Sequence, residues 1–411
     1  MRIVADFHLH SRYSRATSSQ LDLDLLARWA KVKGITLLGT GDCTHPLWLA
    51  ELKQKLKPTS QGLYEYQETL FIPTTEVNNT FFSGGRGKRI HNLLFFPSLE
   101  VAEKVNRQLA RYGDLNSDGR PTLNLAARDL VKLVLEISSD ILIVPAHAWT
   151  PWFSVFGANS GFDTVEDCFG DQAKHIFCLE TGLSSDPAMN WRLSRLDRYT
   201  LISNSDSHSA SRLGREANVF QCEPSYSEIL EILKTKDTKR FLYTVEFFPE
   251  EGKYHFDGHR ACKTRISPEE SEKNQDRCPV CGRKVTVGVM HRVKKLADRP
   301  EGFQPPNQIP FKNMVPLDQI IADARGVGVG SKAVEQEYLD LVQRVGTEFE
   351  ILMDLPEERL RKNLSPKVAD GILKVRKGQV EILPGYDGEY GQVKIFQEGE
   401  QPVSEKQLSL F

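Results

Sequence analysis

Short apolar runs alternate with amphipathic stretches along roughly the first 250 residues. Leu21–Lys33 carries apolar positions with the period of a helix, and Ile35–Leu38 is a short apolar run typical of a buried strand. The alternation returns in a predicted helix within Leu123–Ile137 and in predicted strands at Thr69–Pro73, His91–Phe96, Ile141–Val144, Ile176–Leu179 and Tyr199–Ile202. Repeated strand and helix units of this kind predict an α/β domain over residues 1–250 with a mainly parallel sheet.

The pattern changes after this first region. Gly252–Pro300 holds twelve Lys or Arg against six Asp or Glu, a net charge of +6, together with three of the seven cysteines. From Pro316 onward the apolar positions recur with a helical period until a Gly-rich stretch near residue 384, and a polar tail follows. We therefore expect a small module at 251–300, a helical domain at 301–395 and a flexible tail at 396–411.

Composition and charge narrow the class of protein. With 411 residues, 40% hydrophobic and 26% charged, the chain has the composition of a globular protein with two or three domains. A formal net charge of -2 provides no overall field that would attract nucleic acid or anionic lipid, so a polyanion would need a local patch. Acidic and imidazole side chains near the N-terminus and the lack of a long apolar run predict a cytoplasmic, nucleoid-associated protein with no membrane partner.

Histidines and carboxylates cluster just after the predicted strands. Residues i and i+2 of a strand point the same way, so His8 and His10 can present two imidazoles to one ion, as Asp206 and His208 can present a mixed pair. Mixed imidazole and carboxylate ligands suit zinc, manganese or iron, and a carboxylate such as Glu76 can bridge two ions. The full candidate set is His8, His10, Asp42, His45, Glu76, His91, His147, Asp206 and His208.

This set resembles the PHP (polymerase and histidinol phosphatase) superfamily. The resemblance implies a distorted seven-stranded (β/α) barrel that hydrolyses phosphoesters with metal-activated water. It implies two or three divalent ions (Zn, Mn, Mg or Fe), with catalytic roles for Asp206, Glu76 and His147. The second motif reads GTGDCTH rather than the common T-D-H, so metal binding by Asp42, by His45 or by both stays open. The metal roles that the resemblance implies directly fall on His8, His10, Glu76, His91, His147, Asp206 and His208.

Arginines flank the first and last of these motifs. Arg12 and Arg15 follow the first, and Arg212 and Arg215 follow the last, where they could hold substrate phosphates. Each one taken singly is also explained as a solvated surface arginine.

The cysteines of the basic segment form a second metal motif. His259 and Cys262 are followed by the Cys278 and Cys281 pair, which is the usual sequence form of a closed tetrahedral zinc site. His255 is the alternative fourth ligand. The local positive charge, with Arg292 close by, would suit a surface that follows a DNA backbone, or a solvated face.

The chain ends in Gln407-Leu408-Ser409-Leu410-Phe411, three apolar side chains on a polar tail. A frayed amphipathic end is one reading, but exposed apolar side chains without a core suggest a partner's pocket. The segment matches the bacterial sliding-clamp-binding peptide QLxLF, so we assign Gln407, Leu408, Leu410 and Phe411 to binding a sliding clamp.

Taken together, the PHP motifs, the module YHFDGHRAC…CPVCG, the segment HRVKKLADRPEG and PGYDGEYG resemble the endonuclease Q family over essentially the whole chain. The resemblance implies a bacterial DNA repair enzyme that cuts damaged DNA 5′ of uracil, hypoxanthine, xanthine and abasic sites, leaving a 3′-hydroxyl and a 5′-phosphate. Such an enzyme is expected to flip the altered nucleotide into a pocket. Our hypothesis for stacking or wedge residues is Trp149, Trp152, Phe153 and Phe156, with core packing as the alternative role for some of them. Gly326–Gly330 is a weaker candidate for binding phosphate through backbone amides.

Two other functions compete with this prediction. A small-molecule phosphatase, acting for example on histidinol phosphate, would use the same metal ligands but leaves the cysteine module and the tail unexplained. A non-catalytic adaptor tethered to the clamp would predict a degenerate ligand set, whereas the set here is nearly full.

Overall fold

The main sheet positions the N-terminal strand at the centre of the molecule. The computed structural model describes residues 1–397, and its largest sheet has eight strands in the order β16-β13-β12-β1-β2-β5-β4-β3. The strands β1, β2 and β5 run parallel, and their side chains are almost all buried. The strand bounds are β1 Arg2–Asp6, β2 Leu37–Gly39, β3 Lys57–Pro58, β4 Tyr64–Tyr66, β5 Thr69–Ile72, β12 Ala217–Gln221, β13 Phe241–Glu246 and β16 Phe311–Asn313.

Two smaller sheets adjoin this one. A four-stranded sheet has the order β8-β6-β7-β9, and β10 pairs with β11 in parallel. Isolated backbone hydrogen bonds link the sheets: Ala148 N–H donates to Glu180 O over 2.9 Å, and His10 N–H donates to Ser207 O over 2.9 Å. The residues that follow β1, β9, β10 and β11 are thereby brought together. The bounds are β6 Thr74–Ser83, β7 Arg86–Phe95, β8 Thr122–Leu123, β9 Leu142–Pro145, β10 Cys178–Glu180 and β11 Thr200–Ile202.

The sheets are mixed, so the expectation of a mainly parallel sheet is wrong. The neighbours β1 and β12, β12 and β13, β6 and β7, and β7 and β9 all pair antiparallel. The cause is local in the case of β6 and β7, because Gly84 and Gly85 have φ of 58° and 73° and close a tight hairpin. A parallel neighbour would need a crossover connection of a dozen residues or more.

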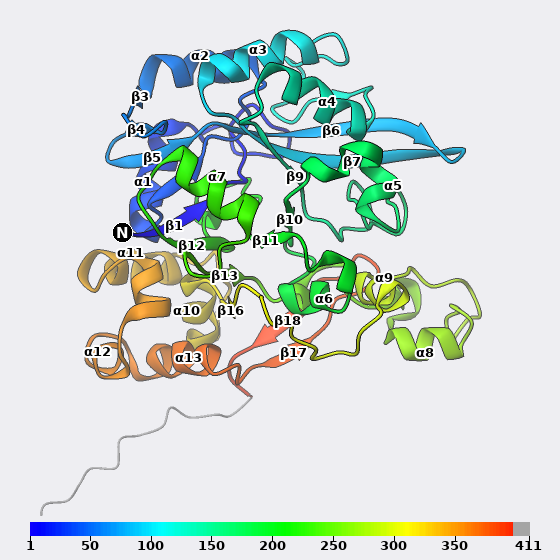
Figure 1. The fold of residues 1–411 in the computed structure, drawn as a ribbon. Coiled ribbons are helices and arrows are strands. Elements are labelled where there is room, and N and C mark those ends of the chain that lie inside the picture. The colour runs from blue at the N-terminus through cyan, green and yellow to red at the C-terminus, as the bar shows by residue number, and fades with distance from the viewer. Residues whose placement is uncertain (398–411) are drawn as a thin grey trace, which may run out of the picture.

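Helices cover the outside of the sheets. Helix α1 (Leu23–Lys33) begins at Asp22, whose side chain accepts from the N–H of Leu25, and ends at Gly34, which has a φ of 84°. Figure 1 shows α2, α3 and α4 side by side along one edge of the molecule. The other helices of this region are α2 Pro46–Lys55, α3 Leu99–Leu109, α4 Ala127–Ile137, α5 Val165–Phe169, α6 Pro187–Trp191 and α7 Tyr226–Thr235.

The remaining described chain forms a small lobe and a helical lobe. The small lobe contains β14 Asp257–His259, β15 Thr264–Ile266, α8 Pro268–Lys273 and α9 Val289–Leu296. The helical lobe contains α10 Leu317–Arg325, α11 Lys332–Arg344, α12 Glu357–Asn363 and α13 Pro366–Arg376, and the hairpin β17 Glu381–Leu383 and β18 Gln392–Lys394 follows it. In Figure 1 this hairpin lies between the two lobes.

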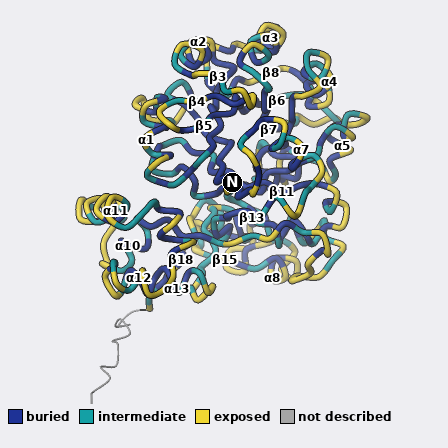
Figure 2. The backbone as a smooth tube through the Cα atoms, turned by 60° about the vertical axis from the view of Figure 1, so that its left-hand side comes forward, coloured by how far each residue is buried: buried dark blue, intermediate teal, exposed yellow. Residues whose placement is uncertain are grey.

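The helical lobe is joined to the main sheet. Strand β16, which falls inside the predicted helical domain, pairs in parallel with β13 and extends the sheet. The buried ammonium of Lys33 in α1 also lies 2.5 Å from the carboxylate of Glu348, which in turn accepts from Tyr338 in α11. One hydrophobic cluster accordingly runs from β1 and α1 into α10–α13. Figure 2 shows the buried strands inside a shell of half-buried and exposed helix positions.

None of the helices within residues 1–397 combines the length and the apolar character that crossing a membrane requires.

Candidate metal centre and its pocket

Four predicted ligands from distant parts of the chain meet beyond the ends of β1 and β11. Ligand atoms of His8, His10, Glu76 and Asp206 all lie within 4.8 Å of one another. The Nε2 atoms of both histidines are 3.3 Å from Glu76 Oε2, and His10 Nε2 is 3.1 Å from Asp206 Oδ1. Glu76 reaches this place from β6, where its side chain is buried. The D-x-H-x-H spacing thus delivers both imidazoles to one point, as the sequence predicts.

A second group shares the same glutamate. Ligand atoms of Glu76, His91 and His147 also lie within 4.8 Å of one another. Glu76 Oε1 is 2.6 Å from His91 Nδ1 and 3.0 Å from His147 Nε2. Each carboxylate oxygen of Glu76 therefore faces a different group, which is the arrangement that a carboxylate bridging two cations requires.

The charges of this cluster fit divalent cations. Burial alone would raise the pKa of Glu76, but His91 and Arg120 outweigh it and hold that pKa well below its ordinary value. Burial would lower the pKa of His8, yet Glu180 and Glu76 raise it well above its ordinary value. The carboxylates therefore demand positive charge, and His8 Nε2 is buried without a hydrogen-bond partner. A metal ion supplies that charge and uses that lone pair, so the donor set fits the divalent ions that the sequence implies.

Two carboxylates hold the histidine ligands from behind. Glu180, which the sequence did not single out, lies 3.0 Å from His8 Nδ1 and accepts from the N–H of His147 over 2.8 Å. Asp42 lies 3.0 Å from His10 Nδ1 and accepts from the N–H of Ser11. A carboxylate on Nδ1 fixes the tautomer that leaves Nε2 free for a metal.

The second predicted motif lies outside both ligand groups within residues 1–397. Asp42 contributes no atom to the metal-ligand groups among residues 1–397, because both of its oxygens are used by His10, Ser11 and Ser14. His45 is also outside these groups, since its Nε2 lies 3.3 Å from Asn116 O and its ring stacks on Tyr13. Ligation by Asp42, His45 or both therefore stays a prediction, and Asp42 is placed to orient His10.

His208 lies beside the first group without joining it. Its Nδ1 is 2.9 Å from the backbone oxygen of Asp206, and its ring centroid is 4.5 Å from that of His10. Within the described residues it adds no atom to either ligand group. The D-x-H pair consequently delivers the carboxylate to the centre and leaves the imidazole at its border.

Several groups of the site adopt backbone conformations that ordinary residues avoid. Asp206, His147 and Asp42 have φ of 45°, 30° and 48°. Non-glycine residues with positive φ cost of order 1–3 kcal/mol each and persist where the surroundings enforce them. Each lies in the loop that follows a strand, His147 after β9, Asp42 after β2 and Asp206 after β11, so the sharp turn aims the side chain across the strand ends.

A pocket of about 580 Å³ opens onto this cluster. His91, His147 and Asp206 form part of its wall, so a ligand in the pocket reaches both groups. Of the predicted stacking residues, Trp152 and Phe153 line the pocket, and Trp152 is 40% exposed. Trp149 and Phe156 instead pack on each other in the core with ring centroids 4.7 Å apart, so their prediction as stacking residues is wrong.

The cysteine module brings a third set of ligands together. His259, Cys262, Cys278 and Cys281 place their ligand atoms within 4.8 Å of one another. Burial alone would raise the pKa of Cys278. Hydrogen bonds from the backbone N–H groups of Cys281 and Val280 outweigh burial and lower this pKa to about 6, which favours the metal-binding thiolate. His255, the alternative fourth ligand, is outside this set and is buried where its Nδ1 has no partner.

The chain is similar to known proteins in both sequence and fold over almost its whole length. The lesion-specific endonuclease PfuEndoQ from Pyrococcus furiosus has 34% identity, and the alignment covers 96% of this chain and 95% of that one with a TM-score of 0.86. The chain belongs to the endonuclease Q family. A structure of Endonuclease Q in complex with a 27-mer duplex substrate carrying an abasic lesion at the active site also has 34% identity and a TM-score of 0.85, over 97% of this chain and 98% of that one.

Two further matches are to uncharacterised sequences. The protein YqxK of Bacillus subtilis is 29% identical over 96% of this chain and 99% of its own length. A family model described as the MJ0043 C-terminal domain matches residues 316–379, which span α10–α13. The endonuclease Q likeness thus extends through both lobes and is not confined to the metal centre.

In this member of the endonuclease Q family, the arginines around the pocket differ in their ion-pair partners and in whether they line the pocket. Arg15 lines the pocket, is 77% exposed and lies 3.5 Å from the carboxylate of Asp118. Arg12 does not line the pocket and is paired with Glu51 over 2.6 Å. Arg120, which the sequence did not single out, also lines the pocket and lies 3.2 Å from Glu76 Oε2.

The other predicted arginines lie farther from the pocket wall. Arg212 is partly exposed near Asp318, and Arg215 donates to Ser205 O. Arg292 donates to the backbone oxygens of Phe156 and Phe162 and to Asp163. These bonds fasten α9 to the α/β domain, and the DNA contact of Arg292 stays a prediction.

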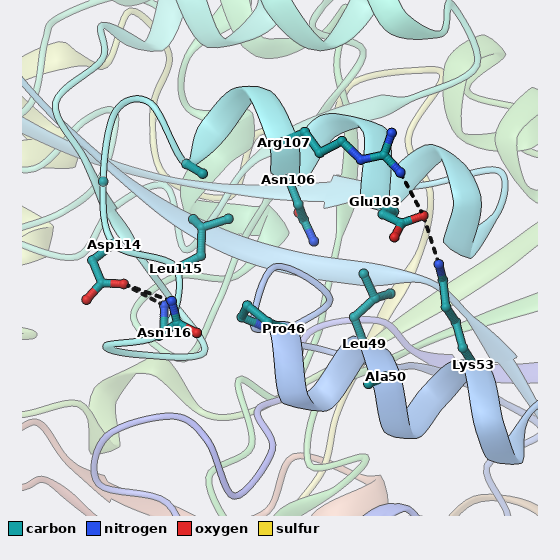
Figure 3. Close-up of a pocket in the computed structure, with 12 residues that line it drawn as sticks. Pro46, Leu49, Ala50, Lys53, Glu103, Asn106, Arg107, Asp114, Leu115 and Asn116 are labelled. Atoms are coloured by element: carbon teal, nitrogen blue, oxygen red, sulfur yellow. Dashed lines mark hydrogen bonds and ion pairs between the residues drawn. The ribbon is translucent and has the colours of Figure 1, made fainter.

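A second hollow of about 830 Å³ lies between α2, α3 and the segment 113–116. Figure 3 shows Leu49 and Leu115 on its walls and the ion pairs that join Glu103 to Lys53 and Arg107. None of the metal-centre side chains lines it. Asp114, the remaining charged group of its wall, accepts from Asn116.

Proposed function

We propose that this protein is a DNA repair endonuclease that hydrolyses the phosphodiester 5′ of uracil, hypoxanthine, xanthine and abasic sites, leaving a 3′-hydroxyl and a 5′-phosphate. The observation that carries this proposal is the bridging position of Glu76 between two ligand groups at the wall of a pocket, in a chain 34% identical to endonuclease Q. The abasic duplex bound by that relative is the substrate class that we transfer to this chain.

The ligands of the active site are His8, His10, Glu76 and Asp206 for one ion and Glu76, His91 and His147 for a second. Bound divalent ions would lower the pKa of a water toward neutrality and would stabilise the attacking and leaving oxygens of an in-line displacement. Zn, Mn, Mg and Fe all accept such ligands. With two groups in place, no protein nucleophile is needed.

The chain's own groups then position the substrate. Arg120 lies 3.2 Å from Glu76 and is 26% exposed at the pocket, where its guanidinium can hold a non-bridging phosphate oxygen. Glu180 and Asp42 keep the Nε2 atoms of His8 and His10 aimed at the centre. The ring centroids of Trp152 and Tyr254 are 5.2 Å apart, and both residues line the pocket. Together they form an aromatic wall for an unstacked base.

The pocket has room for a flipped nucleotide. Its volume of about 580 Å³ falls in the range of small-ligand sites, roughly 300–1,000 Å³. Damaged and mismatched bases cost least to unstack, which gives such a pocket a basis for choosing lesions.

Three further assignments belong to the same proposal. The seven strands β1, β2, β5, β7, β9, β10 and β11 form the distorted barrel of the PHP domain at 1–250, followed by the module at 251–300 and the helical domain at 301–395. His259, Cys262, Cys278 and Cys281 hold one structural zinc. Gln407–Phe411 binds a bacterial sliding clamp; this segment lies outside the described residues.

The substitution Asp206→Asn tests the proposal. Asparagine keeps the shape of Asp206 and tolerates its φ of 45°, so the fold is expected to survive while a ligand charge is lost. We expect incision of an abasic duplex to fall by roughly three orders of magnitude or more, with the dissociation constant for the same duplex nearly unchanged. Undiminished incision would contradict the proposal, and Asp318→Asn, on α10, is the matched control.

A further inference from the structure

The strands β6 and β7 form a two-stranded ribbon that runs from the metal centre to the outside of the molecule. They pair antiparallel over their full length, with Asn78 opposite His91, Thr80 opposite Arg89 and Phe82 opposite Gly87. In Figure 1 the ribbon extends beyond α4 and α5. Strand β6 leaves the site and β7 returns to it, because β6 carries Glu76 near its start and β7 carries His91 in its second half.

One face of the ribbon packs on the molecule. Val77, Asn79 and Ile90 are buried, and the ring of Phe81 stacks on Phe162 with centroids 6.2 Å apart. Because side chains alternate along a strand, this assigns the odd positions of β6 and the even positions of β7 to the packed face. The remaining positions must line the opposite face.

The opposite face continues the wall of the pocket. It begins with Glu76, Asn78 and His91, of which Asn78 and His91 line the pocket. It continues outward through Thr80 and Arg89 to Phe82, which is 86% exposed. We call Thr80, Phe82 and Arg89 the ribbon face. Because the large apolar side chain of Phe82 is almost fully exposed, it has no role in the hydrophobic core.

The charge of the ribbon face suits a polyanion. The guanidinium of Arg89 lies 5.6 Å from the ring centroid of Phe153, which itself lines the pocket. Among residues 1–397, no carboxylate lies within ion-pair distance of Arg89. Arg15 and Arg120 stand at the pocket end of the same path. Cations therefore follow one another from the metal centre outward, with an aromatic ring at the far end.

We propose that the ribbon face is the docking surface for duplex DNA on one side of the lesion, with Arg89 contacting a backbone phosphate and Phe82 packing against the bases in a groove. The inference rests on the proposed function and names how that same site holds its substrate. Arginine with an apolar side chain at the tip of a projecting element is a combination used by proteins that grip a duplex through its groove.

The length of the ribbon fixes where this contact falls. Phe82 is six residues beyond Glu76 on one strand, which at about 3.4 Å per residue places it roughly 20 Å from the centre. With about 3.4 Å per base step along a duplex, the contact lies roughly six base pairs from the scissile phosphate. It lies on one side only, because the ribbon leaves the site in one direction.

The test measures the affinity for abasic duplexes in which one arm at a time is shortened from about twelve to about three base pairs, a length that ends before the ribbon face. Wild-type protein, Phe82→Ala, Arg89→Ala and the double variant are compared by fluorescence anisotropy. Arg86→Ala is the matched control, because Arg86 is exposed at the same tip but belongs, as an even position of β7, to the packed face.

We expect shortening of one arm, and not of the other, to weaken wild-type binding by roughly 10-fold. The double variant should bind the long and the short arm equally, with about the wild-type affinity for the short one, while the control should follow the wild type. If shortening the same arm weakens binding by the double variant as much as it weakens binding by the wild type, the inference is overturned while the proposed function stands. Failure of the wild type to bind or cut any abasic duplex overturns the proposed function and the inference with it.

Discussion

At the scale of single residues, the candidate metal centre depends on carboxylates that lie outside its two ligand groups. Glu180 is fully buried, lies 3.0 Å from His8 Nδ1 and accepts from the backbone of His147, so it fixes one histidine from each ligand group. Outer partners of this kind set the tautomer and the direction of a ligand. The orientation of the whole cluster therefore rests on a residue that lies 172 positions from one of the histidines it holds.

The substitution Glu180→Gln tests this role. The amide removes the negative charge behind His8 and presents an N–H group where only acceptors fit, so both histidines are expected to lose their alignment. We expect the metal concentration for half-maximal incision to rise roughly 10- to 100-fold. An unchanged metal dependence would contradict the role, and Glu231→Gln, an exposed carboxylate beside Arg240, is the control.

Residue patterns predicted the inner ligands better than their supports. His8 and His10 share a strand end at close spacing, so sequence alone indicated that they meet. Glu180 and Arg120 follow no local motif, and their partners lie far along the chain, so only the tertiary fold reveals them. Asp42 and His45 show the opposite case: a motif of the right composition is turned so that its carboxylate serves a histidine.

At the scale of elements, β13 places a buried acid behind the site. Glu246 on this strand is fully buried, and Thr244 and Thr181 donate to its carboxylate over 2.6 and 2.9 Å. Burial outweighs these hydrogen bonds and raises the pKa of Glu246 to about 8. The carboxyl group of Glu246 therefore keeps its proton near neutral pH, whereas a glutamate in the unfolded chain would release it.

The stability of the protein should therefore fall as the pH rises. The folded-state pKa of Glu246 lies above the unfolded value of about 4.3, so from about pH 5 to about pH 8 unfolding releases a proton and is favoured by rising pH. Glu246→Gln removes this loss and should gain about 2–4 kcal/mol on the wild type across that range. Urea unfolding at several pH values measures it; a difference that stays flat with pH would contradict the assignment, with the exposed Glu358→Gln as control.

Elements with clear periodicity were predicted well, and those shaped by pairing were not. The amphipathic pattern of Leu21–Lys33 gave α1 almost to its bounds. The first strand of the ribbon reads TTEVNNTFFS. Its asparagines obscure the alternation of apolar and polar residues by which a half-buried strand is recognised in a sequence. Strand β16 is three residues long and gains its identity only by pairing with β13.

At the scale of the whole molecule, the lobes act as one support for the pocket. Tyr254 from the small lobe lines the pocket beside Trp152 from the α/β domain, and Arg292 fastens α9 to the same domain. The buried pair of Lys33 and Glu348 ties the helical lobe to α1. The substrate pocket is consequently a property of the folded whole, and composition shifts alone could not have predicted it.

The tail should separate cleanly from this body. Removal of Gln407–Phe411, which lies outside the described residues, should abolish binding to a bacterial sliding clamp because it removes all three apolar side chains of the predicted peptide. Incision of a short abasic duplex should stay unchanged. Surface plasmon resonance against immobilised clamp measures the first, and an unchanged clamp affinity would contradict the assignment; Gln401→Ala is the control within the same tail.

The most direct measurement of the central claim is incision of end-labelled duplexes that carry one uracil, hypoxanthine or abasic site, with magnesium or manganese and an unmodified duplex alongside. The account predicts a single cut immediately 5′ of the lesion, with a 3′-hydroxyl on the upstream fragment and no cut in the unmodified duplex. Turnover of small phosphomonoesters without incision of any lesion would keep the metal chemistry and contradict the assignment to DNA repair.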